Sequence, residues 1–364
     1  MRVHYVFSQR KLPLLEQWRA GQQPDTLLFG YNHLAAFGIR ATVWEPTYPA
    51  VGRWAAQQIG RLGPDVLQLR TWRQLRQADA ALLIAGWPLL LVKRLRRWQR
   101  PRMLWLNMTL STLLRRRTPL QHVLRWALGG ADGIVCVAQA QADDLATRLG
   151  RPHRELPVVR SGVDARFHTA VSLADDRPTG RQPFILSAGR DPGRDYGTLV
   201  GAAARLDVPV RIVAGRANVA GLKLPADVEL LLDQPPAKLR ELYRAAACVA
   251  VPTHGDGWPH GSDCSGTLVL LDAMATGRAA VVSERRALAD YVVPGREVLT
   301  VPPGDAAALA AALRCLLDDR RLARRVGQAG RAAIEAGLTT RHFAAGLAPL
   351  LAGETHRPAV GSEP

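Results

Sequence analysis

The sequence predicts an α/β protein built from two doubly wound, Rossmann-like domains. Short apolar runs alternate with helical stretches along the chain, which is the pattern of parallel sheets joined by right-handed crossovers. The length of 364 residues exceeds one ordinary core and fits two. A polar stretch that contains Pro178 and Gly180 interrupts the alternation near the middle of the chain. We therefore expect one sheet before this stretch and a second sheet after it.

The predicted elements follow from local patterns. Predicted strands are Val3–Phe7, Ala41–Trp44, Ala80–Ala85, Met103–Leu106 and Gly133–Val137, then Phe184–Ser187, Val210–Ala214, Val228–Leu231, Cys248–Val251 and Ala279–Val282. Predicted helices are Leu89–Trp98, Ala140–Leu149, Tyr196–Leu206, Ala237–Ala246, Leu268–Thr276, Ala306–Leu317 and Arg321–Ala336.

These patterns divide the chain into segments. We predict an N-terminal Rossmann-like domain over 1–168, a linker over 169–182, a C-terminal Rossmann-like domain over 183–337, a C-terminal helix over 338–352 and a disordered tail over 353–364. Ligands of doubly wound sheets bind at the carboxyl ends of the strands. An active site in the cleft between the domains is therefore expected.

Positive charge is concentrated in the first half. Residues 1–168 hold 25 Lys and Arg against 10 Asp and Glu, and the later residues hold 23 against 21. Residues 88–126 mix these cations with Leu and Trp, as in Lys93, Arg94, Arg96, Arg97 and Trp98. The mixture is typical of a surface that meets anionic lipid, although an ordinary solvated basic helix has the same pattern. No nucleic-acid-binding motif accompanies the charge, so nucleic acid is the less favoured partner.

The cysteines and the apolar runs indicate a location. Cys136, Cys248, Cys264 and Cys315 are scattered and form no CxxC pair, which favours a reducing compartment over a disulfide framework. The apolar run at the start is too short for a signal peptide, and no run is long enough to span a membrane. We expect a cytoplasmic protein, with peripheral attachment to the inner face of the plasma membrane through residues 88–126.

A predicted helix near residue 270 has features of an anion site. Ser265 is a suitable N-cap and Gly277 a suitable residue after the last turn. Small residues at the start, Gly266 and Thr267, would let backbone N–H groups reach a phosphate. Asp272 is a carboxylate in an otherwise apolar helix, so either it binds donors such as ribose hydroxyls or it faces solvent.

Two arginines follow the first strand of the second half. Arg190 comes directly after Ser187-Ala-Gly, at the expected carboxyl edge of the sheet, and Arg194 follows one turn later. Guanidinium groups match the oxygens of a diphosphate. The alternative is a surface ion pair of Arg194 with Asp191 or Asp195.

Five segments in order resemble glycosyltransferase family 4, the retaining family with the GT-B fold, also described as glycosyl transferases group 1. They are Ala131-Asp-Gly-Ile-Val-Cys-Val-Ala138, Val159-Arg-Ser-Gly-Val-Asp-Ala-Arg-Phe167, Ser187-Ala-Gly-Arg190, Ala247-Cys-Val-Ala-Val-Pro252 and the helix that carries Asp272. The resemblance covers roughly residues 130–335 and implies transfer of a sugar from a UDP- or GDP-sugar to a lipid-linked, glycan or small-molecule acceptor, as in polysaccharide biosynthesis. It implies that the domain over 1–168 binds the acceptor and that the domain over 183–337 binds the nucleotide sugar.

The resemblance also implies roles for individual residues. Arg190 matches the phosphate-binding arginine of the family, and Arg194 lies one residue from the position of its lysine. Asp272 matches the acid that holds the ribose, and Gly162 lies in the turn beside the donor sugar. Cys264 stands where the family has its first acid. Either the neighbouring Asp263 replaces that acid, or the enzyme holds its sugar differently or is impaired.

Two further positions depart from the family. Asn107 stands about where the first domain of the family carries a histidine, and Ser8-Gln9-Arg10-Lys11 replaces its glycine-rich turn. The loop 253–263, with His254 and His260, is interpreted as the donor-sugar loop.

No metal is expected. The sequence has no DxD triplet, and His254, Asp256, His260 and Cys264 fit no common zinc spacing. The departures at Cys264 and Asn107 favour one alternative to an enzyme, a non-catalytic relative that binds a partner or a membrane. The basic charge leaves a second alternative, a nucleic-acid-binding protein.

Overall fold

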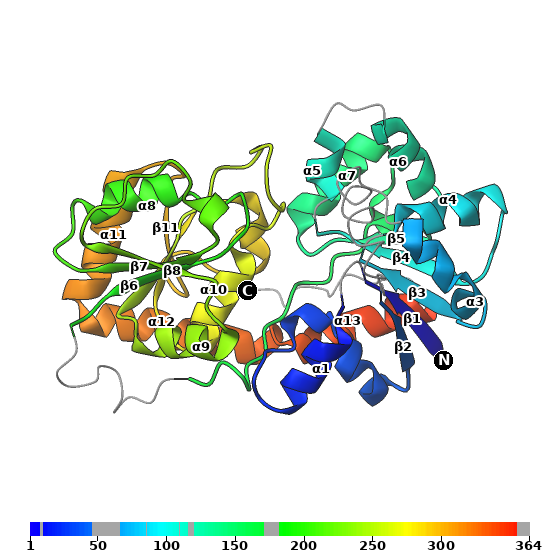
Figure 1. Cartoon of the computed structure of the whole chain (residues 1–364), viewed down its shortest axis with the longest axis horizontal. Helices are drawn as coiled ribbons and strands as arrows, with labels where there is room; N and C mark the ends of the chain where they lie inside the picture. Colours follow the sequence, from blue (N-terminus) through cyan, green and yellow to red (C-terminus); the bar gives the residue numbers. More distant parts are fainter. Residues whose placement is uncertain are drawn as a thin grey trace, which may run out of the picture. The chain divides into compact units, whose positions relative to one another are not determined.

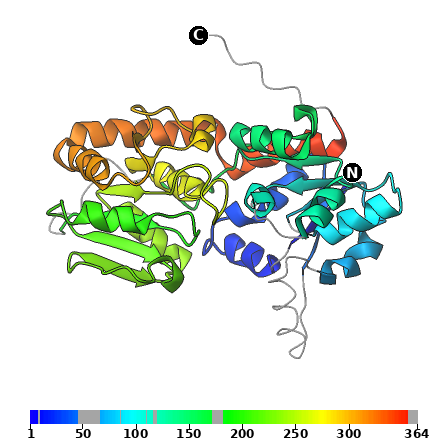
Figure 2. The same cartoon turned by 90° about the horizontal axis from the view of Figure 1, so that it is seen from above.

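The computed structural model of the chain describes residues 1–7, 10–45, 66–84, 86–108, 110–115, 120–170 and 182–354. It divides into two compact units (Figure 1, Figure 2). Unit 1 contains Met1–Glu16, Leu27–Val159 and the residues from Arg341 onward. Unit 2 contains Gln17–Thr26 and Arg160–Thr340.

Unit 1 is a parallel five-stranded sheet in the order β2-β1-β3-β4-β5. Its strands are β1 (Arg2–Val6), β2 (Arg40–Trp44), β3 (Ala80–Leu83), β4 (Arg102–Leu106) and β5 (Gly133–Val135). Its helices are α1 (Leu12–Arg19), whose last residues lie in unit 2, α3 (Trp72–Leu75), α4 (Trp87–Leu95), α5 (Leu110–Arg115), α6 (Leu120–Leu128), α7 (Gln139–Leu149) and α13 (Thr340–Ala352), with short 3-10 helices η1 (Thr26–Leu28), η2 (Tyr31–Phe37), η3 (Val66–Thr71) and η4 (His153–Glu155).

The side chains of β1 alternate between the two faces of this sheet, and both faces are covered. The ring of Tyr5 contacts the ring of Tyr31 in η2, with centroids 5.5 Å apart. The next residue, Val6, belongs to a buried cluster with Leu89 and Leu90 of α4. Successive side chains of a strand point to opposite faces, so each face of this strand has its own apolar partners.

Unit 2 is a parallel six-stranded sheet in the order β11-β10-β9-β6-β7-β8. Its strands are β6 (Ile185–Ala188), β7 (Val210–Ala214), β8 (Val228–Leu232), β9 (Cys248–Val251), β10 (Ala280–Ser283) and β11 (Leu299–Val301). Its helices are α8 (Tyr196–Ala203), α9 (Pro236–Ala245), α10 (Thr267–Ala275), α11 (Ala306–Asp318) and α12 (Arg320–Gly337), with 3-10 helices η5 (Arg216–Asn218) and η6 (Arg286–Asp290).

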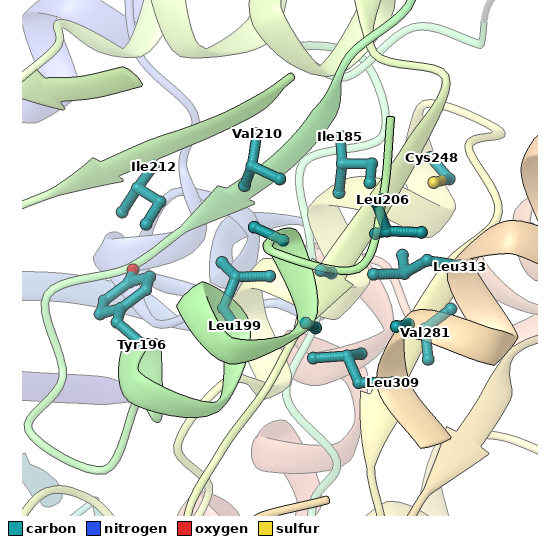
Figure 3. Close-up of a cluster of buried hydrophobic side chains, with 14 of the residues drawn as sticks. Ile185, Tyr196, Leu199, Leu206, Val210, Ile212, Cys248, Val281, Leu309 and Leu313 are labelled. Carbon is teal, nitrogen blue, oxygen red and sulfur yellow. The ribbon is translucent and has the colours of Figure 1, made fainter. Parts of the chain in front are cut away.

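The core of unit 2 lies between this sheet and the helices α8 and α11. Figure 3 shows Leu199 of α8 and Leu309 and Leu313 of α11 beneath Ile185 and Val210 of the strands, and all five side chains are fully buried. Figure 1 shows α9 and α10 on the other face of the sheet. Helices on both faces bury a parallel sheet completely, which confirms the predicted doubly wound architecture.

The units differ from the predicted segments at three places. Residues 160–168 lie in unit 2, where Val163 forms a β-bridge with Thr339. Residues 17–26 also lie there, although the prediction placed them in the domain over 1–168. In α13, every residue after Thr340 lies in unit 1, whereas the prediction treated residues 338–352 as a separate helix. Residues 171–181 of the predicted linker and 355–364 of the predicted tail lie outside the described residues.

Asp164 connects the two separate segments of unit 2. One carboxylate oxygen accepts hydrogen bonds from the Trp18 indole N–H at 3.1 Å and the Asp25 backbone N–H at 3.2 Å. The other accepts from the backbone N–H groups of Arg166 and Phe167, each at 3.0 Å. A buried carboxylate with four donors is fully satisfied, so Asp164 fixes residues 17–26 to the turn 164–168.

Candidate functional site

Arg194 is the most unusual charged residue of unit 2. Its side chain is only 4% exposed, and it follows β6 at the carboxyl edge of the sheet. One terminal nitrogen, Nη2, donates to Ser187 Oγ at 3.0 Å, while Nε and Nη1 have no hydrogen-bond partner among the described residues. The guanidinium also lies over the Tyr196 ring, 5.6 Å from its centroid. A buried cation with unused donors is unfavourable on its own, so this site is suited to an anion.

The start of α10 lies beside this guanidinium. Gly266 has φ 82°, and a Cβ there would lie 3.0 Å from Arg194 Nη1 and 2.9 Å from Thr253 Cγ2. Only glycine combines this backbone conformation with the close approach. The N–H groups of the first helical turn have no partner within the helix, and its dipole is positive there. Two sources of positive potential therefore meet at one place.

The predicted N-cap of α10 is wrong. Gly266, in the left-handed region, occupies the N-cap position instead of Ser265. The Ser265 side chain is buried, and its Oγ has no hydrogen-bond partner among the described residues. Gly277, by contrast, follows the last turn with φ 72°, as predicted. Ser265 therefore contributes an unused hydroxyl near the anion site and does not cap the helix.

Neither predicted ion pair of Arg194 forms among the described residues. Asp191 accepts hydrogen bonds from the backbone N–H groups of Gly193 and Ser262, at 2.7 and 2.9 Å. Asp195 caps α8 by accepting from the Thr198 N–H at 3.0 Å. Both carboxylates are thus used in positioning backbone, which leaves Arg194 without a carboxylate partner.

Arg190 has a different environment. Its guanidinium is 63% exposed and forms an ion pair with Asp233, with Nη2 and Oδ1 2.9 Å apart. Exposed ion pairs of this kind contribute little to stability. Arg190 therefore lacks the burial that holds the Arg194 guanidinium in place.

Asp272 does not simply face solvent. Its side chain is 19% exposed, and its Oδ1 lies 3.2 Å from Nε2 of His168, whose side chain is 3% exposed. Burial and the neighbouring Asp164 carboxylate raise the pKa of Asp272 to about 8. Burial, with the Arg240 and Arg331 charges, lowers the pKa of His168 to about 4. The result is a carboxyl group in a mostly apolar setting with a neutral imidazole beside it.

The other predicted residues surround the same helix end. Burial raises the pKa of the Cys264 thiol to about 12, and Thr267 hydrogen-bonds to it. The Cys264 thiol therefore stays protonated near neutral pH and does not supply the negative charge of the family's first acid. The neighbouring Asp263 is buried, and its carbonyl accepts from Arg285 Nη2 at 2.8 Å. Which of the two takes the place of the first acid stays a prediction.

The loop before α10 presents aromatic rings. The His254 ring stacks on Trp258 with centroids 3.7 Å apart, and the exposed His260 ring lies edge-on to Trp258 at 5.9 Å. The Asp256 carboxylate accepts from Arg285 and from the Arg286 backbone N–H. Within the described part of the chain, three or more His, Cys, Asp or Glu side chains nowhere gather as a metal site would require.

Gly162 is fixed by packing. A Cβ at this position would lie 2.2 Å from the carbonyl oxygen of Thr339, so only glycine allows the two backbones to approach. Its predicted place beside a donor sugar stays a prediction.

In unit 1, Asn107 is fully buried, and its Oδ1 accepts from the Leu110 N–H at 2.9 Å, which positions the start of α5. Its Nδ2 has no partner among the described residues.

Sequence reasoning missed His168 and Asp164. Asp164 lies in the segment Val159–Phe167 that carried the resemblance and His168 directly follows it, but neither was predicted as a member of the site. Asp164 stands in the quoted run Ser161-Gly-Val-Asp164, where a carboxylate directly before a turn is a recognisable signal. His168 offers no such signal, because its partner Asp272 lies far along the chain.

The basic segment of unit 1 is partly as predicted. Arg94, Arg96 and Arg97 are exposed, and Leu95 is 64% exposed between them. Leu113, Val123 and Trp126 are also exposed, and the Arg94 guanidinium lies 4.7 Å from the centroid of the Trp126 ring. Cations and apolar side chains thus share the surface of α4, α5 and α6.

Two residues of this segment correct the prediction. Lys93 is buried and forms an ion pair with Asp132, so it does not belong to a surface. Trp98 is partly buried and stacks on Trp72 with centroids 3.5 Å apart, so it is not free to insert elsewhere. Among the described residues, no helix is both long enough and apolar enough to cross a membrane.

Comparison with known proteins identifies two matching family models. Residues 16–167 match the model described as Glycosyltransferase Family 4, and residues 198–319 match the one described as Glycosyl transferases group 1. A D-inositol 3-phosphate glycosyltransferase from Nocardia farcinica is 30% identical over 242 residues, which cover 60% of this chain and 51% of the relative. The match thus spans about half the length of that relative.

Solved structures resemble the chain over almost its whole length. Sucrose-phosphate synthase from Thermosynechococcus elongatus has a TM-score of 0.73 at 19% identity and covers 97% of this chain and 98% of its own. Anabaena HepE in complex with UDP-glucose has a TM-score of 0.69 at 13% identity and covers 97% and 100%. Likeness at these identities shows the fold, which is GT-B with two Rossmann-like domains, as the resemblance implied.

Proposed function

Because the chain belongs to glycosyltransferase family 4, we propose that it transfers a sugar from a nucleotide-sugar donor to an acceptor. The observation that carries this proposal is the buried guanidinium of Arg194, with two unused nitrogens beside the start of α10. A diphosphate would supply the missing anion and accept those hydrogen bonds. The donor therefore binds at the carboxyl edge of the six-stranded sheet.

Each predicted residue has a role in this proposal. Arg194 and the α10 start, with Gly266, Thr267 and the Ser265 hydroxyl, bind the diphosphate, and Arg190 turns from Asp233 to join them. Asp272 accepts hydrogen bonds from the ribose hydroxyls. The donor sugar lies near Gly162, Asp263, Cys264 and His260.

We propose that the reaction retains the anomeric configuration. The charge that develops on the departing diphosphate is stabilised by Arg194 and by the helix N-terminus, both already in place before the reaction. A phosphate oxygen of the leaving group takes the proton of the acceptor hydroxyl as the new glycosidic bond forms on the same face. No carboxylate nucleophile is required, which is consistent with a neutral Cys264 at the position of the family's first acid.

The donor class can be tested directly. The structure of HepE with UDP-glucose favours a uridine nucleotide, and a GDP-sugar is the alternative. A ligand at a hundred times its dissociation constant adds about 2.7 kcal/mol to stability, so thermal shifts with UDP- and GDP-sugars identify the donor. Hydrolysis of the donor without acceptor, followed by NMR of the anomeric proton, then reports turnover and stereochemistry. If no nucleotide sugar shifts the melting temperature, the chain is a non-catalytic relative.

The exposed surface of α4, α5 and α6 supports a second proposal. Arg94, Arg96 and Arg97 would attract anionic lipid headgroups, while Leu95 and Trp126 insert shallowly among them. Attachment of this kind would bring the enzyme to a lipid-linked acceptor on the cytoplasmic face of the membrane. An acceptor in the lipid phase would be consistent with a role in polysaccharide biosynthesis.

A further inference from the structure

His168 is held rigidly beside Asp272. Its ring lies edge-on to the rings of Phe167 and Tyr243, with centroids 5.1 and 6.0 Å away. Its backbone carbonyl accepts from Arg331 Nη1 at 2.9 Å, and its backbone N–H donates to the Asp164 carbonyl at 3.0 Å. These contacts come from α9, α12 and the turn itself, and in this arrangement Nε2 of the imidazole is directed at Asp272.

The proton on this imidazole has one favourable position. The ring is neutral near pH 7, so only one of its nitrogens carries a hydrogen. Nδ1 is buried without a partner among the described residues, and a buried N–H without a partner is more unfavourable than an unused acceptor. The hydrogen therefore lies on Nε2, which donates it to Oδ1 of Asp272.

The second oxygen of Asp272 has no such partner. Among the described residues, His168 makes the one polar contact to this carboxylate, and the side chain keeps 19% of its surface exposed. We propose that His168 is a positioning residue, which holds Asp272 so that one oxygen stays on the imidazole and the other faces the ribose hydroxyls of the donor. This inference rests on the proposed function.

The surrounding charges determine the pH dependence that this arrangement should give. Asp164 on the same turn opposes ionisation of Asp272, and the Tyr243 hydroxyl of α9 is close enough to interact with it. Arg240 of α9 and Arg331 of α12 face the imidazole and disfavour its protonation. Among these groups, the Nε2–H of His168 is the one whose hydrogen bond favours the carboxylate form of Asp272. Ribose hydroxyls bind a carboxylate more strongly than a carboxylic acid, so donor affinity should rise as Asp272 ionises.

Two variants separate this role from simple packing. His168→Phe keeps a ring but has no donor, whereas His168→Gln keeps an N–H near the Nε2 position and cannot titrate. The matched control is His153→Phe, because His153 forms a similar pair with Asp143, at 3.0 Å, on an exposed surface of unit 1. The readout is the dissociation constant of UDP, or of GDP if the wild type prefers it, measured by calorimetry across pH.

The expected result is a specific pattern. In His168→Phe, UDP should bind roughly 10- to 100-fold more weakly near neutral pH, the factor for one hydrogen bond to a charged group. The pH midpoint of binding should also rise by about one unit. His168→Gln should restore most of the affinity with the wild-type midpoint, and the control should match the wild type.

Two results would overturn the inference, and they are distinguishable. If the wild type binds UDP or GDP but His168→Phe has an unchanged affinity and midpoint, His168 does not position Asp272 and the proposed function stands. If the wild type binds neither nucleotide, the proposed function fails and the inference fails with it.

Discussion

The two units carry positive charge in opposite ways. In unit 1, Arg94, Arg96 and Arg97 are all exposed, and Arg94 also contacts the ring of Trp126. Unit 2 lies mostly in the nearly neutral half of the sequence, yet it contains Arg194, which is buried with two unused nitrogens. A buried charge is selective for an ionic partner, because water cannot solvate it. The number of charges in a region therefore indicates attraction to a surface, and the burial of one charge indicates a bound ligand.

The largest test of this comparison is Arg194→Ala. Loss of one preorganised donor at a site of developing charge should lower donor turnover by roughly two to three orders of magnitude. Steady-state hydrolysis of the sugar nucleotide measures the effect. Arg190→Ala is the matched control, and because Arg190 is exposed and paired with Asp233, its loss should have the smaller effect. Equal turnover in the two variants would remove the distinction between the buried and the exposed arginine.

The second largest expected effect concerns binding of anionic vesicles by the exposed surface of unit 1. Each exposed arginine near an anionic surface contributes about 1 kcal/mol, so replacing Arg94, Arg96 and Arg97 with Gln should weaken binding to anionic vesicles roughly 100-fold. Vesicle sedimentation measures it, and added salt should weaken the wild type in the same direction. Hydrolysis of the donor should not change. Lys93 is left in place because its removal would leave Asp132 without its ion-pair partner. Undiminished sedimentation of the triple variant would show that this surface does not bind lipid.

Asp272→Asn has effects of opposite sign on binding and on stability. The amide replaces an acceptor with a donor, so UDP affinity should fall roughly tenfold or more. The pKa of Asp272 is raised from 3.8 to about 8, so the folded state holds the proton more tightly than the unfolded chain. Between these two pKa values the unfolded chain loses the proton while the folded protein keeps it. The stability of the wild type therefore falls as pH rises through this window.

Asp272→Asn has no carboxyl group at this position, so its stability does not fall in this way as pH rises. Its melting temperature relative to the wild type should rise between about pH 4 and about pH 8, and calorimetric scans at both ends of the window measure it. A melting-temperature difference that does not change with pH would show that Asp272 does not titrate in this window.

The smallest expected effect is that of chelation. The proposed site neutralises the diphosphate with an arginine and a helix N-terminus, so EDTA should leave donor turnover essentially unchanged. The comparison of interest is activity before EDTA, after EDTA and after adding back Mg²⁺ or Mn²⁺. Activity that disappears with EDTA and returns with a divalent ion would contradict the metal-free proposal and direct attention to His254 and His260.

Local patterns predicted most of the fold, and long-range contacts explain what they missed. The buried strands of both sheets are short aliphatic runs, which are visible in sequence. Strand β11, Leu299–Val301, has only three residues, two of them partly exposed, so it has no clear pattern. At the start of α10, Ser265 fits the composition of an N-cap, but the left-handed backbone of Gly266 determines the cap.

The candidate site shows the same division. Arg194 and Asp272 were selected by their positions after a strand and within a helix. Their environments could not be predicted, because burial of Arg194 depends on the approach of Gly266, and the His168–Asp272 contact joins residues far apart in sequence. Lys93 has a cationic helical pattern and is nevertheless buried, since Asp132 comes from a different part of unit 1.

The four hydrogen bonds of Asp164 have a consequence for recombining this protein with its relatives. Two of the donors, Trp18 and the backbone of Asp25, come from a segment that lies early in the chain. A donor-binding half cut at residue 169 would leave behind both those donors and Asp164 itself. A chimera that exchanges nucleotide specificity should therefore transplant residues 17–26 together with 160–340, as a discontinuous module. Shuffling at a single crossover point would separate parts that the fold treats as one.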